Sequence, residues 1–408
     1  MTGTAVVEEL LKNNQYSKIY TLSRSQKGES HEKIQHATLD LQSDAKTMAK
    51  DLADVSGEYV FFCAYLARDD EGEAAKVNSA MLQNFLDALT HTGAIKQVKR
   101  IILTCGLKQY GVHQGLPKQP MHEYDDPWLE ASDRPPNFYY DQQRILQRMG
   151  KDADWDWVVT YPQDVIGYAR GNFMNLATAL GLYCAVSKML PGSELPFPGS
   201  RANYLAFNCW TSARTHARFC LWAAHAPNAG NNAFNVVNGD TESWQNLWPK
   251  LAHRFGCHVP AHMFPGGARG AYADFDATTM PLHKRPPVDE YAQAMGMRGE
   301  FEQSYVHQQI DTTKWAQRPE VKDAWDTLKD KYGMDDQTWE KATWGFLTFV
   351  LGREFSCVVS MSKARKMGWN GYADTWDEFE HTFQKLEREN MLPPVSALKK
   401  EQPDPNTK

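Results

Sequence analysis

Short apolar runs alternate with longer amphipathic segments through the first 170 residues of this 408-residue chain. The runs are nearly continuous in apolar residues, whereas a half-buried strand would alternate apolar with polar ones. Such runs, separated by helices, are typical of a parallel sheet covered on both faces. We expect strands at 18–24, 36–40, 59–65, 100–105 and 157–162, and helices at 3–11, 77–89 and 140–149. The sequence therefore predicts an α/β fold with a Rossmann-type, doubly wound parallel sheet, in which ligands bind at the carboxyl ends of the strands.

The pattern changes after Gly171. A long apolar helix is expected at 173–189, one further strand at 233–237 returns to the sheet, and the region after Cys257 is mostly helical. We predict a nucleotide-binding lobe and a smaller, mostly helical substrate-binding lobe. The first comprises residues 1–168, rejoined by a return strand and helix at about 200–250; the second comprises 169–199 and 251–398. Residues 399–408 are polar and Pro-containing, so we expect a disordered tail.

Composition excludes several classes of protein. Hydrophobic residues make up 42% and charged residues 23%, and the net charge of −6 provides no basic stripe for a nucleic acid. The seven cysteines include no CxxC pair, fit no closed disulfide framework, and favour a reducing compartment. The longest near-apolar stretch, 173–186, is too short to span a bilayer. We therefore expect a soluble, cytoplasmic protein with no nucleic-acid or membrane partner and no metal site.

Polar residues close the first two predicted strands. Ser23 and Arg24 stand where a Rossmann unit meets the adenosine ribose, and an Arg there accommodates the 2′-phosphate of NADP. Arg24 is equally explained as a solvated turn residue, and the local sequence does not separate the two interpretations. Asp40 and Leu41 follow the second strand, where an Asp can contact the adenine edge, although a lone Asp is more often a turn former.

Lysine and tyrosine side chains follow the fourth strand and open the next helix. Lys108 and Tyr110 lie in a Gly-bearing loop at a strand end, a place that commonly lines a site, although a lone lysine is more often solvated. Tyr139 and Tyr140 enter a helix together, and the ordinary explanation is one packed ring and one surface ring. The functional alternative is a phenol that donates a proton. Because its unperturbed pKa is about 10, that role needs a nearby cation.

The order of several motifs narrows these alternatives. The chain contains, in order, Lys108-x-Tyr110, Asn137-Phe138-Tyr139-Tyr140-Asp141, Pro162-Gln163-Asp164-Val165-Ile166-Gly167, Phe173-Met174-Asn175-Leu176 and Ala233-Phe234-Asn235-Val236-Val237-Asn238-Gly239-Asp240. In these motifs the chain resembles the progesterone 5β-reductase/iridoid synthase-like enzymes, atypical members of the extended short-chain dehydrogenase/reductase group. The resemblance covers nearly the whole chain. Its Asn-Phe-Tyr-Tyr motif is specific, since ordinary members use Tyr-x-x-x-Lys.

The resemblance implies a role for each matching residue. Tyr139 matches the catalytic tyrosine, and Lys108 matches the lysine displaced from its usual position. The implied cofactor is NADPH, and its binding residues are Gly3, Ser23, Arg24, Asp40, Leu41, Ala64, Pro162 and Val165. The implied substrate-binding residues are Tyr65, Tyr110, Asn175 and Phe346. The implied chemistry is hydride transfer to the β-carbon of an enone or enal, with the developing enolate charge stabilised by a Tyr hydroxyl and an ammonium.

This chain departs from the family pattern at three places. The tyrosines are followed by Gln142-Gln143-Arg144 where the family has an acidic pair, and Tyr161-Pro162 replaces Arg-Pro. The glycine-rich turn and the strand before it would precede Gly3, which matches only the last glycine. We therefore expect a gap in the sheet beside the strands at 18–22 and 100–104, and an incomplete phosphate cradle. A misassigned start and a truncated relative both explain this, and the chain from Met1 is expected to bind NADPH poorly and to be marginally stable.

The leading interpretation is an NADPH-dependent oxidoreductase that reduces a conjugated C=C bond or a carbonyl in a small apolar metabolite, in specialised metabolism by analogy with the family. Two alternatives stay open. One is a catalytically impaired NADP(H)-sensing or interaction protein on the same fold, and the other is an isomerase or cyclase that uses no net hydride transfer. The sequence leaves the substrate, the stereochemistry and a homodimeric state undetermined.

Overall fold

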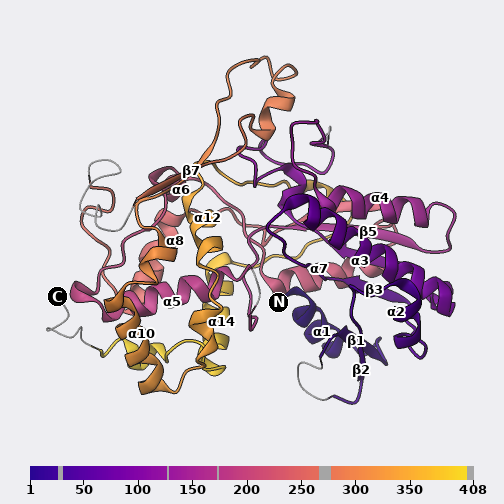
Figure 1. Ribbon diagram of the computed structural model, residues 1–408, viewed down its shortest axis with the longest axis horizontal. Coiled ribbons are helices and arrows are strands. Elements are labelled where there is room, and N and C mark those ends of the chain that lie inside the picture. Colours follow the sequence, from indigo (N-terminus) through magenta and orange to yellow (C-terminus); the bar gives the residue numbers. More distant parts are fainter. Residues whose placement is uncertain (26–30, 126–127, 172–173, 266–276, 402–408) are drawn as a thin grey trace.

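The computed structural model describes residues 1–25, 31–125, 128–171, 174–265 and 277–401. In Figure 1 the sheet and its helices occupy the right of the view, and a mostly helical lobe occupies the left. The two lobes have separate hydrophobic cores. The predicted α/β class with a Rossmann-type parallel sheet is confirmed.

Four parallel strands form the main sheet, in the order β3 (Tyr59–Phe62), β4 (Arg100–Thr104), β5 (Asp156–Pro162) and β6 (Asn232–Val236). Each is a short run of mostly apolar residues, and the two central strands are the most deeply buried. Because all four run in the same direction, their carboxyl ends meet at one edge of the sheet. This edge carries most of the predicted site.

Helices cover both faces of this sheet, as the sequence predicts. On β5, the Tyr161 hydroxyl reaches Gln143 of α4 (Phe138–Gly150), while the Thr160 hydroxyl reaches His216 of α7 (Ala213–His225). Successive strand residues point to opposite faces, so α4 and α7 lie on opposite sides. The helix α3 (Glu71–Thr92) packs beside α4, and α1 (Thr2–Lys12) packs beside α7 (Figure 1).

The strands β1 (Ile19–Ser23) and β2 (Ile34–Thr38) form a separate two-stranded parallel sheet. Within the described residues, neither strand is hydrogen-bonded to the main sheet, which agrees with the expected gap. The expectation that the strand at 100–104 borders this gap is wrong. That strand, β4, pairs with β3 on one side and with β5 on the other, so the edge strand is β3.

The second core is built around α5 (Leu176–Met189), whose residues are buried on all sides. An apolar helix without a polar face has to be surrounded by other elements. Four helices pack directly against it, namely α8 (Trp244–Phe255), α10 (Pro319–Tyr332), α12 (Trp344–Gly352) and α14 (Thr375–Arg388). Figure 1 shows this group as the left-hand lobe.

Shorter elements complete the chain. A two-stranded antiparallel sheet joins β7 (Thr278–Pro281) to β8 (Tyr305–Gln308), a feature the sequence pattern does not indicate. The remaining α-helices are α2 (Ala45–Asp51), α6 (Arg201–Leu205), α9 (Thr312–Trp315), α11 (Gln337–Glu340), α13 (Ser362–Lys366) and α15 (Val395–Leu398). In the described parts of the chain, no helix combines the length and apolar character needed to cross a membrane.

Each of the two hydrophobic cores contains residues from both predicted lobes. The helix α8 packs in the second core, with α5, and buried residues from Phe355 to Trp369 pack in the first core, with the sheet. Of the expected tail, Glu401 forms an ion pair with Lys331, and residues 402–408 lie outside the described residues. Residues 172 and 173, at the expected start of the long apolar helix, also lie outside them.

Candidate active site

The carboxyl ends of β4 and β5 bring Tyr139 and Pro162 together. A Cβ atom placed on Gly106, directly after β4, would lie 3.2 Å from the Tyr139 hydroxyl and 3.4 Å from the Pro162 carbonyl oxygen. Both atoms are therefore close to one point, and a side chain at Gly106 would press against the phenol. The glycine allows the Tyr139 hydroxyl to reach the edge of the sheet where Rossmann folds bind their ligands.

The two adjacent tyrosines are in very different environments. The Tyr140 hydroxyl donates a hydrogen bond to the Gln109 carbonyl oxygen at 2.9 Å and accepts one from the Leu129 backbone N–H at 3.3 Å. Its ring stacks on Trp128. In contrast, the Tyr139 hydroxyl has no hydrogen-bond partner among the described residues. The geometry thus leaves Tyr139 as the phenol available to a ligand.

Asn137 connects Tyr139 to the loop that carries Lys108, here called the lysine loop. Its Oδ1 atom accepts a hydrogen bond from the Tyr139 backbone N–H, which caps α4, and its Nδ2 atom donates to the Lys108 carbonyl oxygen at 2.7 Å. Lys108 lies in the 3-10 helix η2 (Leu107–Tyr110). Its ammonium pairs with the Glu71 carboxylate at 2.9 Å, and both side chains are about one-third exposed. Lys108 is paired with Glu71 and forms no hydrogen bond with the Tyr139 hydroxyl.

Burial controls the acidity of the Tyr139 phenol. It raises the pKa of Tyr139 well above its ordinary value. The neighbouring Cys105, Tyr65 and Glu71 raise this pKa further. Removing an ionisable group from water disfavours its charged form, and negative neighbours act in the same direction. The phenol is consequently protonated over the physiological pH range and can act as a hydrogen-bond donor or an acid.

Two of the segments that depart from the family pattern, Gln142-Gln143-Arg144 and Tyr161-Pro162, contact each other. The Tyr161 hydroxyl donates a hydrogen bond to Gln143 Oε1, and Gln143 Nε2 donates to the Tyr139 carbonyl oxygen at 2.9 Å. All three side chains are buried. A neutral Tyr–Gln pair therefore stands where the family pattern has an Arg and an acidic pair, and it supports the first turn of α4.

The predicted cofactor residues lie along the carboxyl edges of the two sheets. Arg24 is exposed at the end of β1 and forms no ion pair with a described residue. Asp40 accepts a hydrogen bond from the Gln42 backbone N–H at 3.0 Å, which is a turn-forming contact. Leu41, Ala64 and Val165 are half-buried against the first core. Ser23 ends β1, and its hydroxyl donates to the Ser25 carbonyl oxygen.

The helix α1 begins beside the loop that follows β5. A Cβ atom placed on Gly167 would lie 2.8 Å from Met1 Cγ and 2.7 Å from Ala213 Cβ, so this glycine permits a close approach. Gly3 stands in the first turn of α1, which contains no acidic residue. The free backbone N–H groups of such a turn favour an anion.

The loop after β5 contains a buried amide and a buried ion pair. Gln163 is 2% exposed, and neither its Nε2 nor its Oε1 atom has a hydrogen-bond partner among the described residues. Next to it, Asp164 pairs with Arg353 at 2.6 Å. Arg353 follows α12, so this pair ties the end of β5 to the helical lobe. Asp164 has a positive φ of 33°, uncommon for a residue with a side chain.

The predicted substrate residues are not gathered in a single group. Tyr65 follows β3 and stacks on Phe138, directly beside Tyr139. Tyr110 donates a hydrogen bond from its hydroxyl to Asn235 Oδ1 at 2.7 Å. Asn175 caps α5 through Thr178 and also donates to the Ala169 carbonyl oxygen. Phe346 is half-buried on α12. Their contact with a substrate stays a prediction, and Tyr65 is the one placed beside the phenol.

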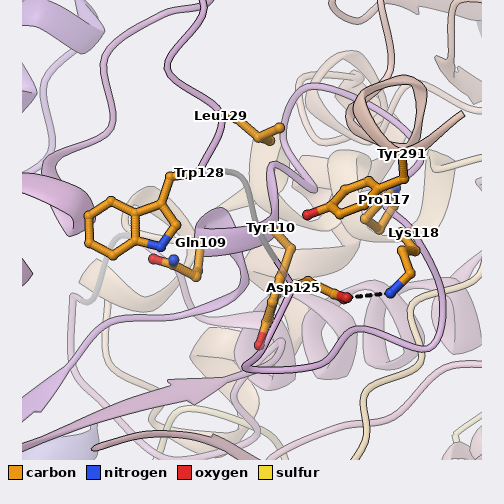
Figure 2. Close-up of a pocket in the computed structure, with 8 residues that line it drawn as sticks. All are labelled: Gln109, Tyr110, Pro117, Lys118, Asp125, Trp128, Leu129 and Tyr291. Atoms are coloured by element: carbon orange, nitrogen blue, oxygen red, sulfur yellow. Dashed lines mark hydrogen bonds and ion pairs between the residues drawn. The ribbon is translucent and has the colours of Figure 1, made fainter. Parts of the chain in front are cut away.

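Figure 2 shows a small pocket next to the lysine loop, which has room for about one water molecule, ≈ 10 Å³. Tyr110 and Gln109 line it, together with the Lys118–Asp125 ion pair and Tyr291. Neither Tyr139 nor Lys108 lines it. The pocket is too small for a metabolite and is distinct from the edge where Tyr139 lies.

Sequence reasoning assigned no role to Glu71 or Gln163. Glu71 opens α3 and meets Lys108 from 37 positions away, which no local motif signals. Gln163 is a polar residue directly after an apolar strand, and that contrast is a signal for it. Within the described ranges, no three His, Cys, Asp or Glu side chains are grouped to hold a metal ion.

The predicted family is confirmed by comparison with known proteins. The PRISE-like Rossmann-fold domain family matches residues 32–270. The chain is 35% identical to an uncharacterized protein of Schizosaccharomyces pombe, over 96% of each chain. It is 26% identical to the 3-oxo-Delta(4,5)-steroid 5-beta-reductase of Arabidopsis thaliana, over 86% of this chain and 78% of the relative.

Solved structures agree with the fold. The UDP-glucose 4-epimerase of Thermotoga maritima superimposes with a TM-score of 0.58 at 14% identity, covering 95% of this chain and 96% of the epimerase. From the sequence matches, which include a short chain dehydrogenase of Penicillium aethiopicum at 26% identity over 96% of this chain and 97% of the relative, the chain belongs to the PRISE-like Rossmann-fold family, among the oxidoreductases of the short-chain dehydrogenase/reductase type.

Proposed function

We propose that this protein uses NADPH to reduce a carbonyl-conjugated C=C bond, or a carbonyl, in a small apolar metabolite. The observation that carries the proposal is the Tyr139 hydroxyl, which is protonated, unpartnered among the described residues and placed at the carboxyl edge of β4 and β5. A similar relative, the Arabidopsis thaliana reductase, is named for a 3-oxo-Delta(4,5)-steroid, an enone.

Membership of this oxidoreductase family implies a nicotinamide cofactor, and three features of the chain fit NADPH. Arg24 is an exposed cation at the end of β1, where the 2′-phosphate would bind. The first turn of α1 offers backbone N–H groups and no acidic side chain to the diphosphate. Gln163, whose amide has no partner among the described residues, directly follows β5, at the edge where the nicotinamide would lie. Bound NADPH would supply the hydride.

The residues of this chain would act on the substrate oxygen. As the β-carbon gains the hydride, negative charge develops on the conjugated carbonyl oxygen, and the Tyr139 hydroxyl donates a hydrogen bond or its proton there. Tyr65 and Phe138 would hold the apolar body of the substrate beside this hydroxyl. Lys108 would assist once its ammonium is released from Glu71, because a nearby cation stabilises the charge that forms.

The test compares two near-identical substitutions. Tyr139→Phe removes only the hydroxyl, so cofactor binding should survive while turnover of an enone falls roughly 10²–10⁴-fold, the usual value of a positioned acid. Tyr140→Phe is the matched control, and its effect should be mainly a loss of stability, since its hydroxyl bonds the backbone. Equal turnover by wild type and Tyr139→Phe would overturn the proposal.

A second candidate is a protein that binds NADP(H) without rapid turnover. The observation that favours it is the Lys108–Glu71 pair, in which the ammonium is bound to a carboxylate and forms no hydrogen bond with the Tyr139 hydroxyl. Measurable cofactor binding, together with absence of enone, enal and carbonyl reduction by the wild-type chain, would select this candidate.

A further inference from the structure

The amide of Gln163 is the most unusual buried polar group near the proposed site. The side chain is 2% exposed, and among the described residues both Nε2 and Oε1 lack a partner. Native proteins satisfy most buried polar groups, because an unmade hydrogen bond in a protein interior is costly. An amide that lacks partners at both ends indicates that something outside the described chain completes it.

The backbone of Gln163 is held firmly, so the unpaired amide is not the result of a loose loop. The Gln163 N–H donates to Thr211 Oγ1 at 2.8 Å, and the Thr211 N–H donates to the Gln163 carbonyl oxygen at 2.9 Å. Beyond it, Asp164 pairs with the fully buried Arg353. These contacts fix the backbone position of Gln163.

Gln163 stands next to the reactive edge of the sheet. The carbonyl oxygen of Pro162, one residue earlier, shares a contact point with the Tyr139 hydroxyl beside Gly106. Along β5, Tyr161 points to the α4 face, where Gln143 lies. The strand β5 ends at Pro162, so Gln163 is the first residue beyond it and lies at the same carboxyl edge as Tyr139.

The Nε2 and Oε1 atoms of Gln163 determine which chemical group a ligand must offer to both of them. Nε2 requires an acceptor and Oε1 requires a donor, and a primary carboxamide offers both in one planar group. A ketone or aldehyde substrate offers only an acceptor and would leave Oε1 unpaired. We infer that Gln163 pairs with the carboxamide of the nicotinamide ring and thereby orients that ring toward Tyr139. This assignment rests on the proposed function, because it requires the nicotinamide cofactor.

The experiment measures binding, so it is independent of turnover. Dissociation constants are determined by calorimetry for wild type and for Gln163→Met, which is nearly isosteric and removes both polar ends. Three ligands are used: NADP⁺, its 3-acetylpyridine analogue, in which a methyl group replaces the amide NH₂, and 2′-phospho-ADP-ribose, which has no nicotinamide. Gln317→Met, at an exposed glutamine, is the control substitution.

Two hydrogen bonds lost together should weaken NADP⁺ binding by Gln163→Met roughly 10- to 100-fold. The affinity for 2′-phospho-ADP-ribose should be unchanged. Wild type should prefer NADP⁺ to the acetylpyridine analogue, and Gln163→Met should lose that preference, as expected if the two groups interact.

Other outcomes would overturn the inference. Unchanged NADP⁺ affinity in Gln163→Met, or an unchanged preference over the acetylpyridine analogue, would show that the amide does not meet the carboxamide. Failure of wild type to bind NADP⁺ would instead refute the proposed function itself, and the inference with it.

Discussion

The Lys108 ammonium lies 2.9 Å from the Glu71 carboxylate, so the cation expected to support the phenol is paired with an anion. Glu71 opens α3 and Lys108 follows β4, so the contact joins two neighbouring strand ends of the sheet. Glu71 is also one of the groups that raise the pKa of Tyr139. One carboxylate therefore acts on both predicted catalytic residues.

Replacing Glu71 should make the phenol more acidic. In Glu71→Gln the negative neighbour is gone and the Lys108 ammonium is released, and both changes favour phenolate. Turnover that depends on protonated Tyr139 should then decline at a lower pH than in wild type. The measurement is kcat/KM against pH, with Glu73→Gln as control, since Glu73 pairs with Arg68 instead. An alkaline limb at the same pH in Glu71→Gln and wild type would contradict this.

Removing the ammonium should have its own effect. Lys108→Met keeps the backbone carbonyl that Asn137 bonds, so the start of α4 should be preserved. We expect turnover to fall by roughly 10²–10⁴-fold, the range typical of a group that assists proton transfer, and the pH–rate profile to move. If rate and profile both matched wild type, Lys108 would be an ordinary solvated lysine that pairs with Glu71.

Cofactor choice should depend on Arg24. The side chain is exposed and forms no ion pair with a described residue, so it is available to a 2′-phosphate. Arg24→Ala should weaken NADPH binding by roughly 10- to 100-fold, the value of a charged hydrogen bond, and leave NADH binding nearly unchanged. Arg24→Lys should be intermediate because it keeps the charge without the planar guanidinium. Fluorescence titration with both cofactors checks this, and equal losses for the two would remove the 2′-phosphate assignment.

The sequence predicts the strands well because their apolar runs are local features. The runs at 59–65, 100–105, 157–162 and 233–237 all appear as parallel strands of the main sheet, and the expected gap separates β1 and β2 from it. The strand that borders this gap was misassigned, because strand order depends on pairing between distant segments. The antiparallel β7–β8 pair is short and polar, so no periodicity announces it.

The candidate site is only partly predictable for a similar reason. The family motif identifies Tyr139, but which tyrosine is free becomes clear only when Tyr140 is seen to bond Gln109 and Leu129. The Glu71–Lys108 pair depends on how the start of α3 lies beside η2. The lack of a partner for the Gln163 amide among the described residues depends on which distant segments pack around it. Such partnerships are properties of the assembled fold and not of any short segment.

Stability should depend on pH through His216 of α7. This side chain is fully buried, and a ring nitrogen lies 2.9 Å from the Thr160 hydroxyl of β5. Burial lowers the pKa of His216 to about 4. In the unfolded chain a histidine takes up its proton near pH 6.5. Between these two values the unfolded state binds more protons than the folded state, so the free energy of unfolding should decrease as the pH falls.

The contribution of His216 should be fully present above pH 6.5 and lost progressively down to about pH 4, with a total on the order of 3 kcal/mol. Urea unfolding at pH 5, 6, 7 and 8 measures it. His216→Gln removes the titrating group, so its unfolding free energy should vary less with pH over this range, whatever its absolute stability. The exposed His253 provides the control, and His253→Gln should retain the wild-type dependence. Parallel pH dependences for wild type and His216→Gln would show that other groups account for any acid sensitivity.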